Sequence, residues 1–229
     1  MSKKKIIALV PMRHHSQRVA GKNYRMLAGR PLYHHILETL EKVPEIDQIV
    51  VDTDSPEIIT GLKSHFPQVT IIERPEALRG DTIPMNEILL YDVSQTSGDL
   101  YIQTHSTNPL LRPETISAAI NKLLDLYPAY DSLFSVTNIK TRLWDELTRP
   151  INHNPAILLQ TQDLPPIYNE NSCFYIFNPE TLKVKRNRLS DRPLMFEVDR
   201  SEAWDIDEEI DFLMADLLMR HHLGQTLNK

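Results

Sequence analysis

The chain has 229 residues, of which 41% are hydrophobic and 24% charged, values that are typical of a globular protein and exclude a disordered, collagen-like or coiled-coil chain. The net charge of -6 argues against a dedicated nucleic-acid-binding protein, and the single cysteine, Cys173, excludes an intramolecular disulfide. Glycine is scarce, with 6 residues where average usage would give roughly 16, so a glycine-rich phosphate loop is not expected.

The chain begins with an apolar run that predicts a buried strand over residues 5–11. The run is too short to span a membrane and makes a poor signal peptide. We therefore expect a cytoplasmic protein with no membrane association.

Strands and helices are predicted to alternate through the first 136 residues. Strands are expected at 48–51, 69–72, 100–103 and 132–136, and helices at 31–40, 85–93 and 113–126. A further helix is expected after Ser55, with Ser55 as N-cap and Pro56 at the first position. This alternation predicts an α/β fold with a mostly parallel sheet. Right-handed crossovers place the loops 12–23, 52–55 and 104–112 along one edge, where ligands bind.

The alternation stops in the second half of the chain. The segment from Asn138 to Tyr168 holds four prolines and an apolar patch, and is interpreted as an insertion. A buried strand is expected at 173–177, followed by a closing helix over 206–221 whose apolar residues are Ile206, Ile210, Leu213 and Leu217. We expect one domain spanning 1–229, in which 138–170 forms a lid or a subunit contact. The insertion predicts a homodimer.

Charge is distributed unevenly between the two ends. No acidic residue precedes Glu38, whereas nine lie between Glu197 and Asp216. If the two ends meet at one cleft, the basic N-terminal segment would suit a polyanion and the acidic C-terminal segment a divalent metal ion. The alternative is a soluble enzyme with uneven surface charge.

The first predicted loop carries side chains suited to phosphate. The segment VPMRHHSQRVAGKN, residues 10–23, offers cations and hydrogen-bond donors to a triphosphate, but lacks the Walker pattern. Further motifs follow: GRPL at 29–32, VVDTD at 50–54, RPEALRGDT at 74–82, HSTNPLLR at 105–112, YNENSCFYI at 168–176 and DID at 205–207. In this order, the motifs resemble those of the acylneuraminate cytidylyltransferase family, which makes CMP-sugars.

The resemblance implies a Rossmann-like nucleotidyltransferase fold and a reaction between CTP and a 2-keto-3-deoxy acid sugar, sialic acid or a related nonulosonic acid. The products would be a CMP-sugar and pyrophosphate. By resemblance, the triphosphate is held by Arg13, Ser16, Gln17 and Lys22, and the nucleotide also by Asn23. Cytosine would contact Arg74 and the backbone near Ile83 and Met85.

Two acidic residues near the C-terminus suit a metal ion. Asp205 and Asp207 alternate, so in extended backbone their carboxylates point the same way, and two such oxygen ligands suit Mg²⁺. Taken alone, an Asp-x-Asp before a helix is more often a cap or a solvated face. One carboxylate could take the proton of the attacking hydroxyl, and His105 is a second candidate for that proton or a donor to the sugar. The predicted catalytic residues are Arg13, Lys22, His105, Asp205 and Asp207.

On the sugar side, the resemblance places His105, Thr161, Tyr168, Asn171 and Tyr175. This sequence departs from the family at His15, which replaces a glycine, and at Thr161, which lies near the arginine that sialic-acid enzymes carry for the sugar. Recognition of the sugar carboxylate must then come from elsewhere, with Arg142 and Arg149 as candidates. The alternatives are a nucleotidyltransferase for another sugar or polyol and a non-catalytic nucleotide-sugar-binding paralogue.

Overall fold

The computed structural model describes residues 3–80 and 82–224. The strands are β1 (Ile6–Met12), β2 (Met26–Leu27), β3 (Arg30–Pro31), β4 (Gln48–Thr53), β5 (Thr70–Glu73), β6 (Leu100–Thr104), β7 (Ser132–Ile139), β8 (Ile167–Phe177) and β9 (Pro193–Glu197). The α-helices are α1 (Leu32–Leu40), α2 (Pro56–His65), α3 (Met85–Ser94), α4 (Pro113–Leu126), α5 (Pro179–Lys185) and α6 (Glu209–His222). Short 3₁₀ helices are η1 (Lys22–Tyr24), η2 (Glu76–Leu78) and η3 (Thr161–Asp163).

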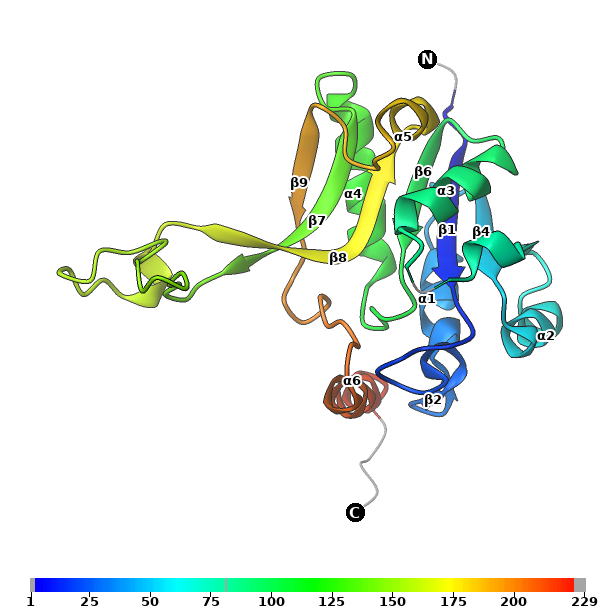
Figure 1. Cartoon of the computed structure of the whole chain (residues 1–229), viewed down its shortest axis with the longest axis horizontal. Coiled ribbons are helices and arrows are strands. Elements are labelled where there is room, and N and C mark those ends of the chain that lie inside the picture. The colour runs from blue at the N-terminus through cyan, green and yellow to red at the C-terminus, as the bar shows by residue number, and fades with distance from the viewer. Residues whose placement is uncertain (1–2, 81, 225–229) are drawn as a thin grey trace.

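A seven-stranded sheet forms the centre of the molecule, in the order β5-β4-β1-β6-β8-β7-β9 (Figure 1). Only β8 is antiparallel to its neighbours, β6 and β7, while the other pairs are parallel. The predicted α/β fold with a mostly parallel sheet is therefore confirmed. The parallel strands β4, β1 and β6 place their carboxyl ends at one edge, which is where such sheets bind ligands.

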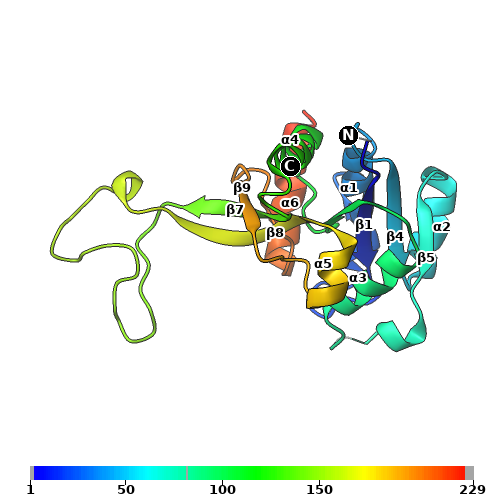
Figure 2. The same cartoon turned by 90° about the horizontal axis from the view of Figure 1, so that it is seen from above.

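Helices cover both faces of this sheet (Figure 2). Apolar residues of α1, α2 and α4 pack with one face, and those of α3 and α5 with the other. Helix α6 instead packs beside the hairpin of β2 and β3, at the edge where the strands end (Figure 1). Strand β1 is buried along its whole length, as its continuous apolar sequence predicts.

Local signals in the sequence set the start of α2. The backbone N–H of Ile58 donates to Ser55 Oγ at 3.3 Å, and Pro56 occupies the first helical position. The predicted cap is confirmed.

No helix among residues 3–80 and 82–224 is long and apolar enough to cross a membrane.

The closing helix differs from the prediction. It begins at Glu209, because Glu208 and Asp211 form a reciprocal capping box there, so Ile206 is buried in the preceding segment. Ile210 and Leu213, expected on the buried face, are 58% and 54% exposed. The buried positions are instead Phe212, Ala215 and Met219, which contact the region of the β2–β3 hairpin. The prediction of the apolar face was wrong because it took Ile206 as part of the helix.

The predicted insertion is the outer part of a long hairpin arm. β7 and β8 leave the central sheet together and remain paired out to Ile139 and Ile167, and the chain between them forms an irregular tip (Figure 1). Large apolar side chains are exposed on this tip: Trp144, Leu147, Ile151, Ile157, Leu158 and Leu159. The arm therefore presents apolar surface away from the body of the molecule.

Candidate active site

A cavity of about 270 Å³ lies at the carboxyl ends of β1, β5 and β6. Eight residues predicted for the site line it: Arg13, Ser16, Lys22, Asn23, Arg74, Ile83, Met85 and His105. Arg79, Ser106 and Thr107 also line it and were not singled out from the sequence. Two of the three loops that were expected along this edge, 12–23 and 104–112, line this space. The loop 52–55 contributes no lining residue, and the segment after β5 lines the cavity instead.

The loop after β1 is held in shape from inside. Asn23 is buried, its Nδ2 donates to the carbonyl oxygen of Arg13 at 2.7 Å, and its Oδ1 accepts from Ser106 Oγ at 2.7 Å. Gly21 has φ of 61°, a left-handed conformation that favours glycine, and a Cβ there would lie 2.8 Å from the Tyr24 ring. In this arrangement Asn23 fixes the loop, because both ends of its amide are already bonded within the protein.

The two histidines of this loop lie in different surroundings. The backbone N–H of His14 donates to Asp54 Oδ1 at 2.7 Å, and its ring Nδ1 lies 2.9 Å from Ser55 Oγ. His14 thus ties the loop to the start of α2. His15, interpreted from the sequence as replacing a family glycine, is exposed. Gln17 is exposed and does not line the cavity.

The acidic segment meets the basic loop beside the cavity. Lys22 Nζ donates to the carbonyl oxygen of Ile206 at 2.5 Å, and Arg18 forms an ion pair with Asp207. Burial raises the pKa of Asp205, although a hydrogen bond with Thr107 opposes the shift, and burial lowers the pKa of Lys22. Basic groups predicted for phosphate and acidic groups predicted for metal therefore converge.

Asp205 and Asp207 form a pair rather than a complete ligand set. No group of three or more His, Cys, Asp or Glu side chains that could hold a metal ion occurs in the described part of the chain. The charge of Asp207 adds to the effect of burial in raising the pKa of Asp205. Mg²⁺ keeps several waters and also binds substrate phosphates, so two carboxylates fit its requirements.

Arg74 is held by buried acid groups. Its side chain is 4% exposed and its Nε donates to Asp52, whose side chain is 1% exposed. The carboxyl group of Asp92, also buried, lies against that of Asp52, and burial together with the Asp52 charge raises the pKa of Asp92 to about 9. Asp92 is therefore expected to hold a proton near neutral pH, next to the ion pair of Asp52 and Arg74. The sequence indicated Arg74 but not Asp92, which looks like an ordinary position in α3.

His105 is a neutral imidazole in this environment. Burial, Arg188 and Lys22 lower its pKa to about 4. The amide Nε2 of Gln103 lies 2.8 Å from His105 Nε2, and because an amide nitrogen only donates, Nε2 accepts and Nδ1 carries the proton. This inferred tautomer favours a hydrogen-bond donor to substrate over a proton acceptor, the two roles expected from the sequence.

Apart from His105, which lines the cavity, the residues predicted for the sugar side are spread over three places. Tyr175 is buried in β8, and its hydroxyl donates to Glu170. Asn171 donates to Thr137 Oγ1 at 2.7 Å and lines a separate groove that contains Trp204. Tyr168 lies on the arm, and Thr161 lies farther out in η3. Within one chain, none of these four residues lines the cavity.

Arg188 is a basic residue that the sequence did not indicate. Its Nη1 donates to Gln103 Oε1, and its Cζ lies 3.5 Å from the centre of the Tyr175 ring. Arg188 belongs to no recognised motif, and its position depends on the loop between α5 and β9, elements that were not predicted. Asp81, within the motif at 74–82, lies outside the described residues.

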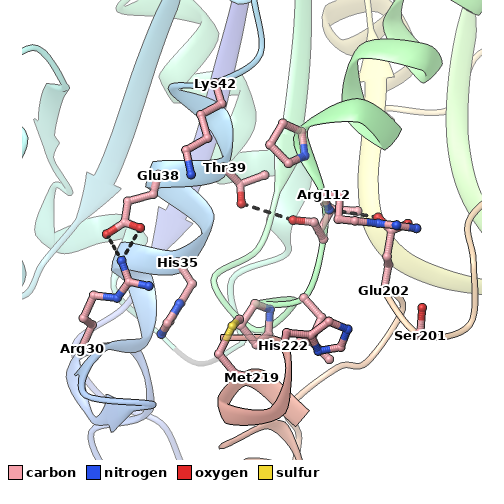
Figure 3. Close-up of a pocket in the computed structure, with 14 residues that line it drawn as sticks. Arg30, His35, Glu38, Thr39, Lys42, Arg112, Ser201, Glu202, Met219 and His222 are labelled. Carbon is pink, nitrogen blue, oxygen red and sulfur yellow. Dashed lines mark hydrogen bonds and ion pairs between the residues drawn. The ribbon is translucent and has the colours of Figure 1, made fainter. Parts of the chain in front are cut away.

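A second cavity of about 250 Å³ lies between α1, α6 and the loop before α4 (Figure 3). Arg30 in this cavity pairs with Glu38, and Arg112 with Glu202. None of the predicted site residues lines it. The cavity at the carboxyl ends of the strands is therefore the candidate active site.

Comparison with known proteins identifies the family of the chain. Residues 7–219 match the family model described as Cytidylyltransferase. The chain belongs to the cytidylyltransferase family. Among curated members, it is 30% identical to CMP-N,N'-diacetyllegionaminic acid synthase of Legionella pneumophila, with 94% of this chain and 96% of that protein covered.

Two further relatives share less sequence identity with this chain. N-acylneuraminate cytidylyltransferase A of Danio rerio is 26% identical over 92% of this chain, which spans only 50% of that protein. Among solved structures, a CMP:2-keto-3-deoxy-manno-octonic acid synthetase complexed with CTP has a TM-score of 0.69 at 15% identity, covering 95% of this chain and 99% of the other. This likeness supports the Rossmann-like nucleotidyltransferase fold of the family.

Proposed function

We propose that this protein transfers the CMP group of CTP to a 2-keto-3-deoxy acid sugar, releasing pyrophosphate. The observation that carries the proposal is the cavity at the carboxyl edge, where Arg13, Ser16 and Lys22 line a space bordered by Asp205. The relative from Legionella and the N-acylneuraminate enzymes are named for this kind of reaction. The acceptor would be a nonulosonic acid of the sialic or legionaminic type.

In the proposed reaction the anomeric hydroxyl of the sugar attacks the α-phosphate, the bond to the β-phosphate oxygen breaks, and pyrophosphate leaves. Arg13, Ser16 and Lys22 would bind the triphosphate, with Gln17 in the same loop as a further donor. Catalysis of this kind depends on positioning and on neutralising phosphate charge. Arg74 and the backbone at Ile83 and Met85 would enclose the cytosine.

Asp205 and Asp207 would hold Mg²⁺, which when bound neutralises phosphate charge and lowers the pKa of the nucleophile. One of the two carboxylates would take the proton of the attacking sugar hydroxyl. The other would keep the cations of the loop after β1 in place, as Asp207 does with Arg18. His105, neutral and protonated on Nδ1, would donate a hydrogen bond to the sugar or to the phosphate.

We further propose that two copies pair through the arm. Leu158 is 89% exposed, Leu147 63% and Trp144 51%. Exposed apolar surface of this kind marks interaction sites in proteins. Pairing would bury it, and a partner's arm would bring its own Thr161 and Tyr168 to a sugar site. The cytoplasm, which supplies CTP, is the proposed location.

Pyrophosphate release tests this function directly. The protein would be incubated with Mg²⁺, each of four nucleoside triphosphates, and each of three acids: N,N'-diacetyllegionaminic acid, an N-acylneuraminic acid and 3-deoxy-manno-octulosonate. Turnover with CTP and one of these acids is expected. CTP binding by calorimetry without turnover on any acid would indicate the non-catalytic paralogue, and turnover only with a neutral sugar or a polyol phosphate would indicate the other nucleotidyltransferase.

A further inference from the structure

Arg188 is fixed in place by two buried residues of neighbouring strands. Its guanidinium lies on the ring of Tyr175 in β8, with Cζ 3.5 Å from the ring centre, and Nη1 donates to Gln103 in β6. Tyr175 is 1% exposed and Gln103 is fully buried, so neither partner can readily move. A planar guanidinium stacked on an aromatic ring loses little entropy when it binds a further group.

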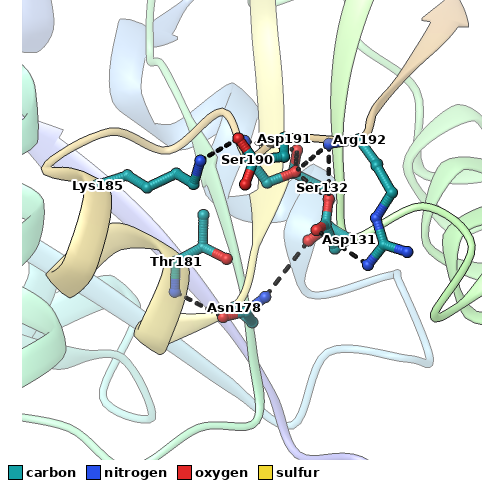
Figure 4. Close-up of polar contacts among 8 residues, drawn as sticks. All are labelled: Asp131, Ser132, Asn178, Thr181, Lys185, Ser190, Asp191 and Arg192. Atoms are coloured by element: carbon teal, nitrogen blue, oxygen red, sulfur yellow. Dashed lines mark hydrogen bonds and ion pairs between the residues drawn. The ribbon is translucent and has the colours of Figure 1, made fainter.

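The loop that carries Arg188 is anchored on both sides (Figure 4). Before it, Asn178 caps α5 by accepting from the Thr181 N–H at 2.8 Å. After it, Ser190 Oγ lies 2.7 Å from Ser132 Oγ, and Arg192 pairs with Asp131 at 3.4 Å. These contacts tie the loop to the start of β7, so the position of Arg188 is set by the fold.

Arg188 carries a charge that no carboxylate of the described chain neutralises by a direct ion pair. The carboxylate that acts on it, Glu170, accepts a hydrogen bond from the Tyr175 hydroxyl instead. A partly buried cation without an ion-pair partner is costly to the free protein. Such a group is suited to an anionic ligand.

The location of Arg188 relates it to the reacting groups. Gln103, which accepts from Arg188, also donates to His105 on the cavity wall. Arg188 and Lys22 both act electrostatically on His105, so both lie close to it. The next residue, Leu189, packs in the same apolar cluster as Met85, another lining residue. Arg188 therefore lies beside the cavity, near the end that holds Lys22 and His105.

We propose that Arg188 binds the carboxylate of the acid sugar. This inference rests on the proposed function and assigns the missing carboxylate contact. In a 2-keto-3-deoxy acid the carboxylate is attached to the carbon that bears the attacking hydroxyl, so it must lie within a few bonds of the α-phosphate. An arginine can bind it through two parallel hydrogen bonds, which fixes the orientation of that carbon.

The two arginines suggested by the sequence are less suitable in this chain. Arg142 and Arg149 both lie on the arm, away from the body. Arg142 donates to the carbonyl oxygen of Leu159, and Arg149 is paired with Asp145 at 2.6 Å. None of the three arginines lines the cavity itself. Arg188 is in the body, however, and shares Gln103 with His105, a residue of the cavity wall.

The test compares Arg188→Met and Arg188→Lys with Arg186→Met, an exposed arginine two residues away that pairs with Glu87 on the surface. Steady-state pyrophosphate release would give KM for CTP and for whichever of the three acids the wild-type protein uses. Arg188→Met should raise KM for the acid about 30-fold, the value of a charge-assisted pair, and leave KM for CTP within about twofold. Arg188→Lys should give a KM for the acid between those of Arg188→Met and the wild type, since lysine keeps the charge but lacks the two parallel N–H donors of the guanidinium.

Chemical rescue separates binding from structure. Adding guanidinium ion to Arg188→Ala at concentrations far below those that unfold the protein should restore part of the activity, and it should not affect Arg186→Ala. An unchanged KM for the acid in Arg188→Met, or an equal rise in KM for CTP, would overturn the assignment while leaving the proposed function standing. If the wild-type protein uses none of the acids, the proposed function and this inference fail together.

Discussion

Lys22 Nζ donates to the carbonyl oxygen of Ile206 at 2.5 Å, across 184 residues of sequence. The bond joins the basic loop after β1 to the backbone between Asp205 and Asp207. The uneven charge of the two ends therefore has a structural counterpart, because the positive and negative segments meet beside one cavity. The basic segment suits a triphosphate, and the acidic segment suits a divalent cation. Both ligands could therefore be held at the point where the segments meet.

Asp207→Asn tests the acid pair. The substitution keeps the size of the side chain and removes its charge, so kcat should fall about 100-fold or more if the carboxylate binds a metal ion at the reacting phosphate. Glu209→Gln is the control, since Glu209 pairs with Arg25 on the surface and should change kcat by less than about twofold. Steady-state rates over a range of Mg²⁺ concentrations measure both. Activity near that of the wild type in Asp207→Asn would refute the role in metal binding.

Asn23→Ala tests whether the loop after β1 is shaped from within. The change removes the donor to the Arg13 carbonyl and the acceptor for Ser106, so it should cost about 1–3 kcal/mol in the free energy of unfolding. KM for CTP should rise because Arg13 and Lys22 would no longer be held in position. Urea unfolding and calorimetric titration with CTP give the two values. A variant with normal stability and weak CTP binding would show instead that Asn23 contacts the nucleotide directly.

Sequence patterns predicted the parts of this fold that depend on local chemistry. The continuous apolar run of β1 and the Ser55-Pro56 start of α2 are examples, since each signal acts within a few residues. The antiparallel direction of β8, by contrast, depends on where the chain returns to the sheet, which no local pattern encodes. Helix α5 is only 7 residues long and β9 only 5, so neither shows a clear period.

In the candidate site, too, some residues could be predicted from local sequence patterns and others could not. Residues in recognisable motifs, such as Arg13, Lys22 and His105, were predicted and line the cavity. Arg188 and Asp92 were missed because their environment comes from elements far apart in sequence. A lone arginine after a short helix and a lone aspartate within one are ordinary in sequence, and only packing reveals that one faces Gln103 and the other Asp52.

Asp92→Asn tests whether Asp92 holds a proton beside the ion pair of Asp52 and Arg74. The pKa of Asp92 is raised to about 9 in the folded state from 3.8, so between these values the folded state holds a proton that the unfolded state has lost. Its contribution to stability is therefore full below pH 4 and is lost as the pH rises toward 9. Asparagine mimics the protonated acid and removes this dependence.

The stability of Asp92→Asn relative to the wild type should thus grow with pH, by about 2–4 kcal/mol between pH 5 and pH 8. Thermal unfolding across this range measures it. Asp125→Asn, at an exposed position of α4, serves as the control and should show no such trend. A constant difference between Asp92→Asn and the wild type at all pH values would mean that Asp92 is charged in the folded protein.

Leu158→Glu tests pairing through the arm. A side chain that is 89% exposed in one chain contributes nothing to the core of that chain, so its replacement should leave thermal unfolding of the monomer unchanged. If two arms pack together, a glutamate at the contact would place a desolvated charge there and shift the dimer toward monomer.

Light scattering at micromolar concentration should then give about 53 kDa for the wild type, twice the chain mass of 26.5 kDa, and a lower mass for the variant. Val184→Glu, at a 79% exposed position on α5 in the body, should leave the mass unchanged. A wild-type mass of one chain would rule out the dimer at that concentration, and a dimer that survives Leu158→Glu would place the contact elsewhere.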